Sequence, residues 1–195
     1  EAQIRLMEKL KNHHGKNSML VLRPAEAKET TVAWKMAMEN TATPTALIFS
    51  RQNITDLPEG NDYSLAERGA YIVAGSDENP DVVMVASGSE VSTLISGANL
   101  LRKDGVRCRI VSVPSEGLFR SQPKEYQESV VPAGAKVFGM TAGLPVNLQG
   151  FLVGAAPESK IWGLESFGYS APYKVLDEKL GYTGENVYAQ VKAML

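Results

Sequence analysis

The chain has 195 residues, 22% of them charged, and a formal net charge of −2, with the basic residues scattered along it. This balance argues against a nucleic-acid partner and against binding to an anionic membrane surface, and no apolar run is long enough to span a bilayer. The single cysteine, Cys108, excludes an internal disulfide framework and fits a reducing, cytoplasmic environment.

Residues 1–12 have the pattern of a helix that starts without a cap. Ile4, Leu6, Met7 and Leu10 recur at helical spacing, but no capping residue and no initiating methionine precede them. We therefore expect the chain to be a piece of a larger α/β protein.

The next segment predicts one β-α-β unit over residues 19–51. A short apolar strand at 19–22 is closed by Arg23-Pro24, and a helix with a broad apolar face follows from about 25 to 40. That face includes Val32, Trp34, Met36 and Met38. The mostly apolar run after Pro44, TALIFSR, is typical of a strand buried on both sides.

A polar stretch with little periodicity separates this unit from the rest of the chain. Residues 52–69 contain Pro58 and two glycines, which is typical of an exposed linker. We predict three parts: residues 1–51 as the tail of one α/β domain, 52–69 as the linker, and 70–195 as a second domain.

The second domain continues the alternation of strands and helices. Strands are expected near 70–73, 81–87, 106–115, 136–140 and 160–166, with a turn at 75–81; helices are expected at 90–103, 123–130, 167–181 and 183–195. Strands that alternate with helices favour parallel pairing with crossover connections. The predicted fold class is α/β: a mostly parallel open sheet with helices on both faces, preceded by the partial β-α-β unit.

One turn could bind an anion. The run Ser87-Gly88-Ser89-Glu90 follows a strand and opens a helix, where free N–H groups attract phosphate. It contains neither a dinucleotide-binding glycine pattern nor a phosphate-binding loop with its lysine. A helix N-cap formed by Ser89 is the favoured alternative.

The histidines and the cysteine predict no reactive centre. His13 and His14 are adjacent, so on a helix they cannot chelate one metal ion from a single face, and a solvated helix end is the favoured interpretation. Cys108 alternates with Arg107 and Arg109 in a predicted strand, so its thiol is expected to face the core and to be inert.

Two charged residues follow predicted strands at the edge where open α/β sheets bind ligands. Glu165 follows the fifth strand of the second domain, and a carboxylate that caps the next helix is its favoured role. Arg51 follows the apolar strand after Pro44, where a guanidinium could bind phosphate or carboxylate with two parallel hydrogen bonds. An arginine that solvates the strand end or pairs with a linker carboxylate is an equal alternative.

Other catalytic patterns are missing from the sequence. We find no paired carboxylates, no metal-ligand cluster, no nucleophile with its base and no glycine-rich diphosphate loop. We therefore predict that the chain holds an incomplete active site.

Several motifs resemble the transketolase family. Arg23-Pro24 with the acidic helix start, and Ser50-Arg51-Gln52-Asn53 after the apolar strand, are similar to the end of that family's pyrimidine-binding domain. Further stretches resemble the C-terminal domain of the same family: Arg68-Gly69-Ala70-Tyr71, Ala86 to Val91, Arg109 to Ser115, Tyr126 to Pro132, Phe167-Gly168, Ser170-Ala171-Pro172 and Gly181-Tyr182-Thr183. The stretch from Thr141 to Trp162 departs from the family pattern.

The resemblance implies a homodimeric enzyme that transfers a two-carbon ketol unit between sugar phosphates, with thiamine diphosphate and Mg²⁺ bound outside this chain. It implies no catalytic, cofactor-binding or metal-binding residue here. It assigns one residue, Arg51, to the phosphate of the substrate, and it places packing and dimerisation in the C-terminal domain.

Two other functions stay open from the sequence. A related C-terminal assembly domain occurs in dehydrogenase E1 components and in deoxyxylulose-phosphate synthase, but Ser50-Arg51-Gln52-Asn53 favours transketolase. A stand-alone anion-binding α/β module would instead use Gly88 to Glu90.

Overall fold

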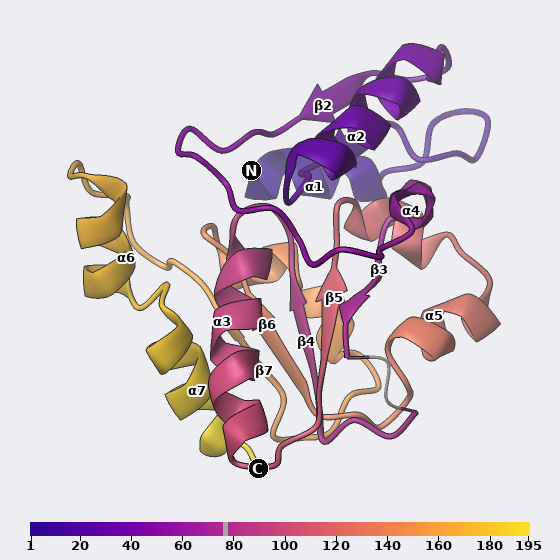
Figure 1. The fold of residues 1–195 in the computed structure, drawn as a ribbon. Helices are drawn as coiled ribbons and strands as arrows, with labels where there is room; N and C mark the ends of the chain where they lie inside the picture. The colour runs from indigo at the N-terminus through magenta and orange to yellow at the C-terminus, as the bar shows by residue number, and fades with distance from the viewer. Residues whose placement is uncertain (76–77) are drawn as a thin grey trace.

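The computed structural model describes residues 1–75 and 78–195 (Figure 1). The predicted turn at 75–81 therefore lies partly outside the described residues. The elements in chain order are α1 (Ala2–Lys9), β1 (Leu20–Leu22), α2 (Ala27–Glu39), β2 (Thr45–Leu47), the 3₁₀ helix η1 (Tyr63–Arg68), β3 (Tyr71–Ala74), β4 (Val82–Ala86), α3 (Glu90–Lys103), β5 (Cys108–Ser112), α4 (Glu116–Arg120), α5 (Lys124–Val130), β6 (Val137–Met140), η2 (Pro145–Asn147), η3 (Gln149–Leu152), β7 (Lys160–Trp162), α6 (Tyr173–Leu180) and α7 (Gly184–Lys192).

Residues 70–195, the C-terminal unit, are built on a five-stranded sheet in the order β3-β5-β4-β6-β7. The four strands β5, β4, β6 and β7 are parallel, with Met84 of β4 opposite Ile110 on one side and Phe138 on the other. The edge strand β3 runs antiparallel to β5. The prediction of a mostly parallel open sheet is confirmed, whereas the reversed edge strand was not predicted.

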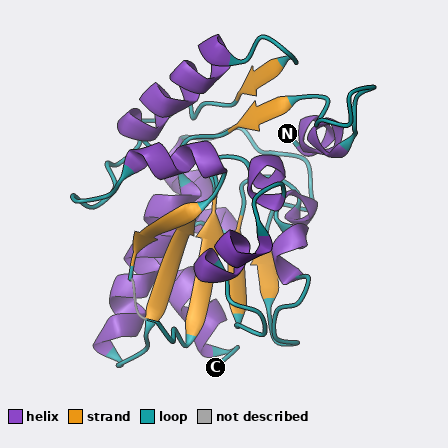
Figure 2. Cartoon of the chain, turned by 90° about the vertical axis from the view of Figure 1, so that its right-hand side faces the viewer, coloured by secondary structure: helices purple, strands orange, loops and turns teal. Residues whose placement is uncertain are grey.

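Two hydrophobic clusters occupy opposite faces of this sheet. Alternate side chains of β4 point to each: Met84 packs in the cluster covered by α3 and α7, and Val83 and Val85 in the cluster that includes Phe119 and Val130 from α4 and α5. Period-two alternation sends neighbouring residues of a strand to opposite faces. The predicted helices on both faces are therefore confirmed (Figure 2).

The α3 and α7 helices pack closely because the contact residue on α3 has no side chain. A Cβ atom added at Gly97 would lie 2.4 Å from Cγ1 and 2.5 Å from Cβ of Val187 on α7. Val187 is completely buried, so neither helix can give way without disturbing the core.

Residues 1–51, the N-terminal unit, form a parallel β1–β2 pair with α1 and α2 beside it. The prediction that the strand after Pro44 is buried on both sides is wrong: all three residues of β2 are half-buried. Among the described residues β2 pairs with β1 alone, so its other edge has no neighbouring strand.

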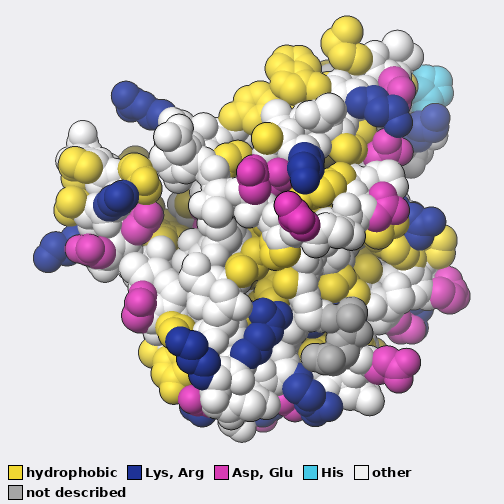
Figure 3. Space-filling view, in the orientation of Figure 1, with side chains coloured by type: hydrophobic (Ala, Val, Ile, Leu, Met, Phe, Trp, Pro, Cys, Tyr) yellow, Lys and Arg dark blue, Asp and Glu magenta, His cyan; other side chains and the backbone are white. Residues whose placement is uncertain are grey.

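The broad apolar face predicted for α2 is also wrong in part. Ala33 is buried and Val32 packs against the core, but Trp34 is 51% and Met38 77% exposed. Apolar side chains consequently gather on the surface over the N-terminal unit (Figure 3).

The α1 helix buries its charged side chains instead of its apolar ones. Arg5 and Glu8 are 2% and 1% exposed, whereas Leu6 and Leu10, which recur at helical spacing, are 51% and 58% exposed. Arg5 and Glu8 can be buried because polar groups of the C-terminal unit bind them. Arg5 Nη2 donates to Ser87 Oγ (3.3 Å), and Ser115 Oγ donates to Glu8 Oε1 (2.6 Å).

The N-terminal unit covers the edge of the five-stranded sheet at which the parallel strands end, here called the carboxyl edge (Figure 1). The backbone N–H of Arg23 donates to the carbonyl of Pro114, two residues beyond β5 (2.8 Å). The backbone N–H of Gly88, two residues beyond β4, donates to the carbonyl of Arg23 (3.2 Å). The two units therefore share a hydrogen-bonded boundary.

A buried carboxylate pair starts α2 at the same boundary. Glu26 accepts from the backbone N–H of Glu29, and Glu29 accepts from the N–H of Ala25 and from the hydroxyl of Tyr71 on β3, all at 2.7–2.8 Å. The bond from the N–H of Glu29 caps the first turn of α2, and the bonds to Glu29 tie that turn to the preceding chain and to β3. Burial raises the pKa of Glu29.

The segment 52–69 is not exposed throughout, as a linker would be. Leu57 and Ala66 are 4% and 3% exposed and belong to the hydrophobic core, and η1 packs against α2. The three-part division of the chain stays a prediction. Within the described residues, no helix combines the length and the apolar character that a membrane crossing requires.

Gly97→Ala should destabilise the chain by about 1–3 kcal/mol, the usual cost of overpacking a well-filled interior. The added Cβ would overlap Val187, which is held in the core. Urea unfolding followed by circular dichroism measures the change. Asn99→Ala on the exposed part of α3 is the control, and equal effects of the two substitutions would contradict the packing account.

The Glu8 carboxyl should make the stability of the chain fall as pH rises. Burial raises its pKa above the ordinary 4.5, an effect that Ser115 and Arg5 partly offset, so the folded chain holds this proton more tightly than the unfolded chain. The stabilisation from Glu8 is complete below pH 4.5 and is lost as pH rises through the raised pKa.

Urea unfolding of wild type and Glu8→Gln at several pH values tests this effect. Wild type should lose free energy of unfolding relative to the variant as pH rises from about 4.5 toward neutrality. Glu178→Gln, which removes an exposed carboxylate from α6, is the matched control. A difference between wild type and Glu8→Gln that stays constant with pH would refute the proposed effect.

Candidate functional site

Arg51 lies four residues beyond the end of β2, at the boundary of the two units, and its side chain is exposed. It lines two adjoining hollows. One, of about 380 Å³, is here called the Arg51 cavity; the other, of about 550 Å³, is bounded by residues 169–173 and Leu176. The α6 helix, which stands at the side of the molecule, forms part of both walls (Figure 1).

The walls of the Arg51 cavity come from both units. The N-terminal unit and the segment after it supply Arg23 and residues 49–55, and the C-terminal unit supplies Ser89, Glu90, Ser92, Thr93, Ala142, Tyr173, Asp177 and Tyr182. Most of these groups are polar, as a site for a charged or hydroxylated ligand requires.

The charges around the cavity leave one exposed guanidinium. Arg23 is 7% exposed and is neutralised by Glu90, to which it donates two hydrogen bonds. Among the described residues, Arg51 has neither a hydrogen bond nor an ion pair. The alternative that it pairs with a linker carboxylate is therefore contradicted.

Two titratable groups of the C-terminal unit that line the Arg51 cavity have raised pKa values. Burial, and then the charge of Glu90, raise the pKa of Asp177. Burial likewise raises the pKa of Tyr182 to about 12, and its hydroxyl donates to the carbonyl of Thr141 (2.9 Å). Among the groups that line this cavity, the exposed guanidinium of Arg51 is the one that suits an anionic ligand.

The arrangement offers binding groups and lacks a catalytic set. Arg51 can present parallel N–H donors to a phosphate or a carboxylate. Within the described ranges, 1–75 and 78–195, no three His, Cys, Asp or Glu side chains are grouped so that they could hold a metal ion.

The turn at Ser87–Glu90 is occupied by protein groups. The Arg23 guanidinium donates to the carbonyl of Ser87 and to the Glu90 carboxylate. A Cβ atom added at Gly88 would lie 2.6 Å from Cζ of Arg23. Ser89 stands at the N-cap position of α3 but does not cap it: its hydroxyl donates to Glu90 Oε1 (2.9 Å). The favoured N-cap role of Ser89 is wrong, and the structure supplies nothing that favours an anion there.

The two histidines and Glu165 lie at the surface. His13 and His14 occupy an exposed turn beyond α1, not a helix end, because α1 ends at Lys9. Glu165 is exposed and does not cap α6, whose N-cap is Pro172 without a side-chain hydrogen bond. The predicted capping role of Glu165 is therefore wrong.

Cys108 is 1% exposed, which confirms its predicted place in the core, and burial raises its pKa to about 11. Its neighbour Arg109 is 5% exposed, so the alternation predicted for this strand fails there. The guanidinium of Arg109 donates to the carbonyls of Ser129 and Val130 at the end of α5 (3.1 and 3.2 Å). Such donors satisfy the free carbonyls of a helix end and explain why a charged residue is buried.

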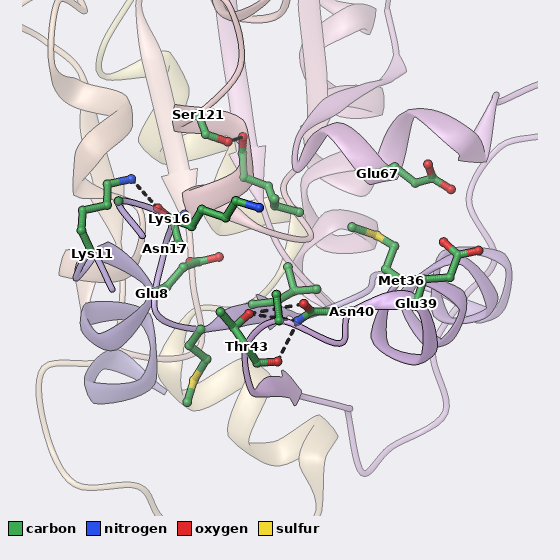
Figure 4. A pocket seen from close by; sticks show the side chains of 15 residues that line it. Glu8, Lys11, Lys16, Asn17, Met36, Glu39, Asn40, Thr43, Glu67 and Ser121 are labelled. Carbon is green, nitrogen blue, oxygen red and sulfur yellow. Dashed lines mark hydrogen bonds between the residues drawn. The ribbon is translucent and has the colours of Figure 1, made fainter. Parts of the chain in front are cut away.

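A larger cavity, of about 620 Å³, lies away from Arg51. Side chains that line it include Glu8, Lys11, Lys16, Glu39 and Glu67, and Figure 4 shows them spread around a wide opening. Lys11 donates to Asn17 (2.6 Å), and the charges around the opening are of both signs. The mixed charges of the lining therefore favour neither an anionic nor a cationic ligand.

Sequence reasoning missed the cavity residues of the C-terminal unit. Asp177 and Tyr182 are more than a hundred residues from Arg51 in the sequence, so no local pattern connects them to it. Gln52 was quoted as part of a motif, but its contact with Ser89 depends on the folded boundary.

Residues 69–183 match the family model described as the transketolase-like TK C-terminal domain. The transketolase of Staphylococcus aureus strain MW2 is 40% identical over 180 residues, which are 91% of this chain and 27% of that protein. A transketolase structure from Leishmania mexicana aligns with a TM-score of 0.83 and 34% identity over 99% of this chain and 26% of that one.

A Pichia stipitis transketolase structure in complex with sedoheptulose 7-phosphate aligns with a TM-score of 0.80 and 30% identity. It covers 93% of this chain and 26% of that one. The chain thus spans about a quarter of the length of the relatives it matches. From the matched domain and these similarities, we conclude that this chain belongs to the transketolase family.

Proposed function

We propose that this chain is part of an enzyme that transfers a two-carbon ketol unit from a ketose phosphate to an aldose phosphate, and that Arg51 binds the phosphate of the substrate. The observation that carries the second part is the exposed guanidinium beyond β2, which has no ion pair among the described residues and lines a polar cavity. Membership of the family carries the first part.

A phosphate suits Arg51 better than an uncharged hydroxyl would. The planar guanidinium matches two phosphate oxygens at once, and charge-assisted hydrogen bonds are stronger than neutral ones. Arg51 would thereby hold the end of the sugar that does not react. Such remote binding orients the reacting carbons.

Ketol transfer breaks the C2–C3 bond of the ketose and forms a bond between that C2 and the aldehyde carbon of the acceptor. The C3 hydroxyl of the donor loses its proton and the acceptor oxygen gains one. Thiamine diphosphate, when bound, supplies the carbanion chemistry that this exchange requires.

The residues of this chain do not fit the cofactor or its metal. Within the described part of the chain no acidic, histidine or cysteine side chains form a metal-ligand cluster, and the start of α3 is filled by Arg23 and Glu90. We therefore assign thiamine diphosphate and Mg²⁺ to other parts of the full-length protein. The role of this chain is to pack, to bind phosphate and to orient the sugar.

Two further proposals concern the whole protein. We propose a homodimer, on the family resemblance, and sedimentation of the full-length protein tests it. We propose the cytoplasm as its location, because the single thiol is buried and no disulfide is needed.

In the full-length enzyme, Arg51→Ala should raise KM for phosphorylated sugars about 10- to 150-fold, since a charge-assisted phosphate contact contributes about 1.5–3 kcal/mol. Thiamine diphosphate affinity should change little. Steady-state kinetics with a ketose phosphate and with an unphosphorylated ketose measure the difference.

Two variants control this experiment. Arg51→Lys keeps the charge and loses the planar fork, so its KM should be intermediate. Lys174→Ala removes an exposed cation from α6 without touching the cavity. The assignment of Arg51 fails if Arg51→Ala affects both ketoses equally.

The chain of residues 1–195 alone should bind no thiamine diphosphate, because its described residues offer no metal-ligand cluster. Isothermal titration with thiamine diphosphate and Mg²⁺ checks this expectation. A micromolar dissociation constant would contradict the assignment of the cofactor to other parts of the protein.

A further inference from the structure

The segment around Arg51 lies between two packed side chains, Phe49, whose ring contacts Trp34, and Leu57, which is buried in the core. From Phe49 to Leu57, a range the structure describes throughout, the one hydrogen bond is from Gln52 Nε2 to Ser89 Oγ (3.4 Å). The N–H of Ile48, just before this range, still donates to Leu22 in the strand pair (2.8 Å). Between Phe49 and Leu57, Gln52 therefore provides the hydrogen bond that ties the segment next to Arg51 to the C-terminal unit.

Ser89 is in turn held by a buried ion pair. Its hydroxyl donates to Glu90 Oε1 (2.9 Å), and the other oxygen of that carboxylate accepts from Arg23 Nη1. Arg23 Nη2 adds a second bond to Glu90 Oε1 (3.1 Å). Two parallel donors from Arg23 fix the orientation of the Glu90 carboxylate. Glu90 in turn orients the Ser89 hydroxyl, whose oxygen accepts the hydrogen bond from Gln52.

The turn that carries Ser89 has little freedom to move. Arg23 and Glu90 are 7% and 5% exposed, and Gly88 adopts a φ of +66° with the Arg23 guanidinium packed on it. A left-handed φ strains other residues, and a Cβ here would meet Arg23 as well. The buried network at the boundary thus extends to Ser89, which contacts the residue next to Arg51.

We propose that Gln52 is a positioning residue that holds the Arg51 segment on the Ser89–Glu90–Arg23 network and so sets the affinity for phosphorylated substrates. This inference rests on the proposed role of Arg51. A phosphate bound by an arginine on a loose segment must order that segment first, which lowers affinity. Gln52 removes part of this cost in advance.

The amide of Gln52 suits this role better than a carboxylate. Ser89 Oγ uses its proton on Glu90, so it needs a donor from Gln52, and the amide Nε2 supplies one. A glutamate at position 52 would have no donor when ionised and would add a negative charge beside Glu90. Gln52→Glu should therefore be worse than Gln52→Ala.

The test is a double-mutant cycle in the full-length enzyme with Arg51→Ala, Gln52→Ala and the double variant. Gln52→Ala should raise KM for the ketose phosphate about fivefold, the order expected for one neutral hydrogen bond, with kcat changed less than about twofold. KM for the unphosphorylated ketose should stay at the wild-type value. In the Arg51→Ala background, Gln52→Ala should have no further effect.

Ser89→Ala removes the acceptor from the other side and should reproduce the effect of Gln52→Ala. Asp56→Asn is the matched control, because the Asp56 side chain is exposed and has no hydrogen-bond partner among the described residues. Thermal unfolding midpoints close to wild type show that each variant folds. If Gln52→Ala unfolds, Gln52→Asn, which keeps the amide on a shorter side chain, replaces it in the cycle.

The outcomes separate this inference from the proposed function. If Arg51→Ala does not discriminate between the two ketoses, the role of Arg51 is wrong and the positioning inference falls with it. If Arg51→Ala discriminates but Gln52→Ala does not, the positioning inference alone is overturned. An equal effect of Gln52→Ala with and without Arg51 also overturns it.

Discussion

The buried ion pair between Arg23 and Glu90 is the interaction on which the arrangement of the two units depends. Arg23 follows β1 and Glu90 opens α3, so the pair joins the end of one strand pair to the helix that covers the other sheet. Removing one partner from such a pair leaves an uncompensated buried charge, which costs about 3–5 kcal/mol. The close turn at Gly88 makes room for the guanidinium.

This junction changes where a ligand can bind. Open α/β sheets usually bind ligands at the carboxyl ends of their strands. Here that edge of the five-stranded sheet is covered by the N-terminal unit, through contacts to Ser87 and Pro114 just beyond β4 and β5. The available polar cavity lies beside the junction, where Arg51 faces α6. Fold and candidate site therefore follow from the same contacts.

Local patterns predicted local structure well and tertiary contacts poorly. The α3 helix runs over the predicted residues, Glu90–Lys103, because its apolar period and its Asp104-Gly105 end are local signals. The burial of Arg5 and Glu8 could not be predicted, since their partners are 82 and 107 residues away. The same holds for the cavity: the sequence identifies Arg51, but its neighbours on α6 depend on how the units pack.

A crystal structure of the full-length enzyme with a bound ketose phosphate tests the central claim most directly, which is that Arg51 serves the phosphate and not the reacting carbons. The account predicts the phosphate oxygens within about 2.7–3.2 Å of the Arg51 guanidinium, at the mouth of the Arg51 cavity. A phosphate bound elsewhere, with Arg51 in solvent, would contradict it.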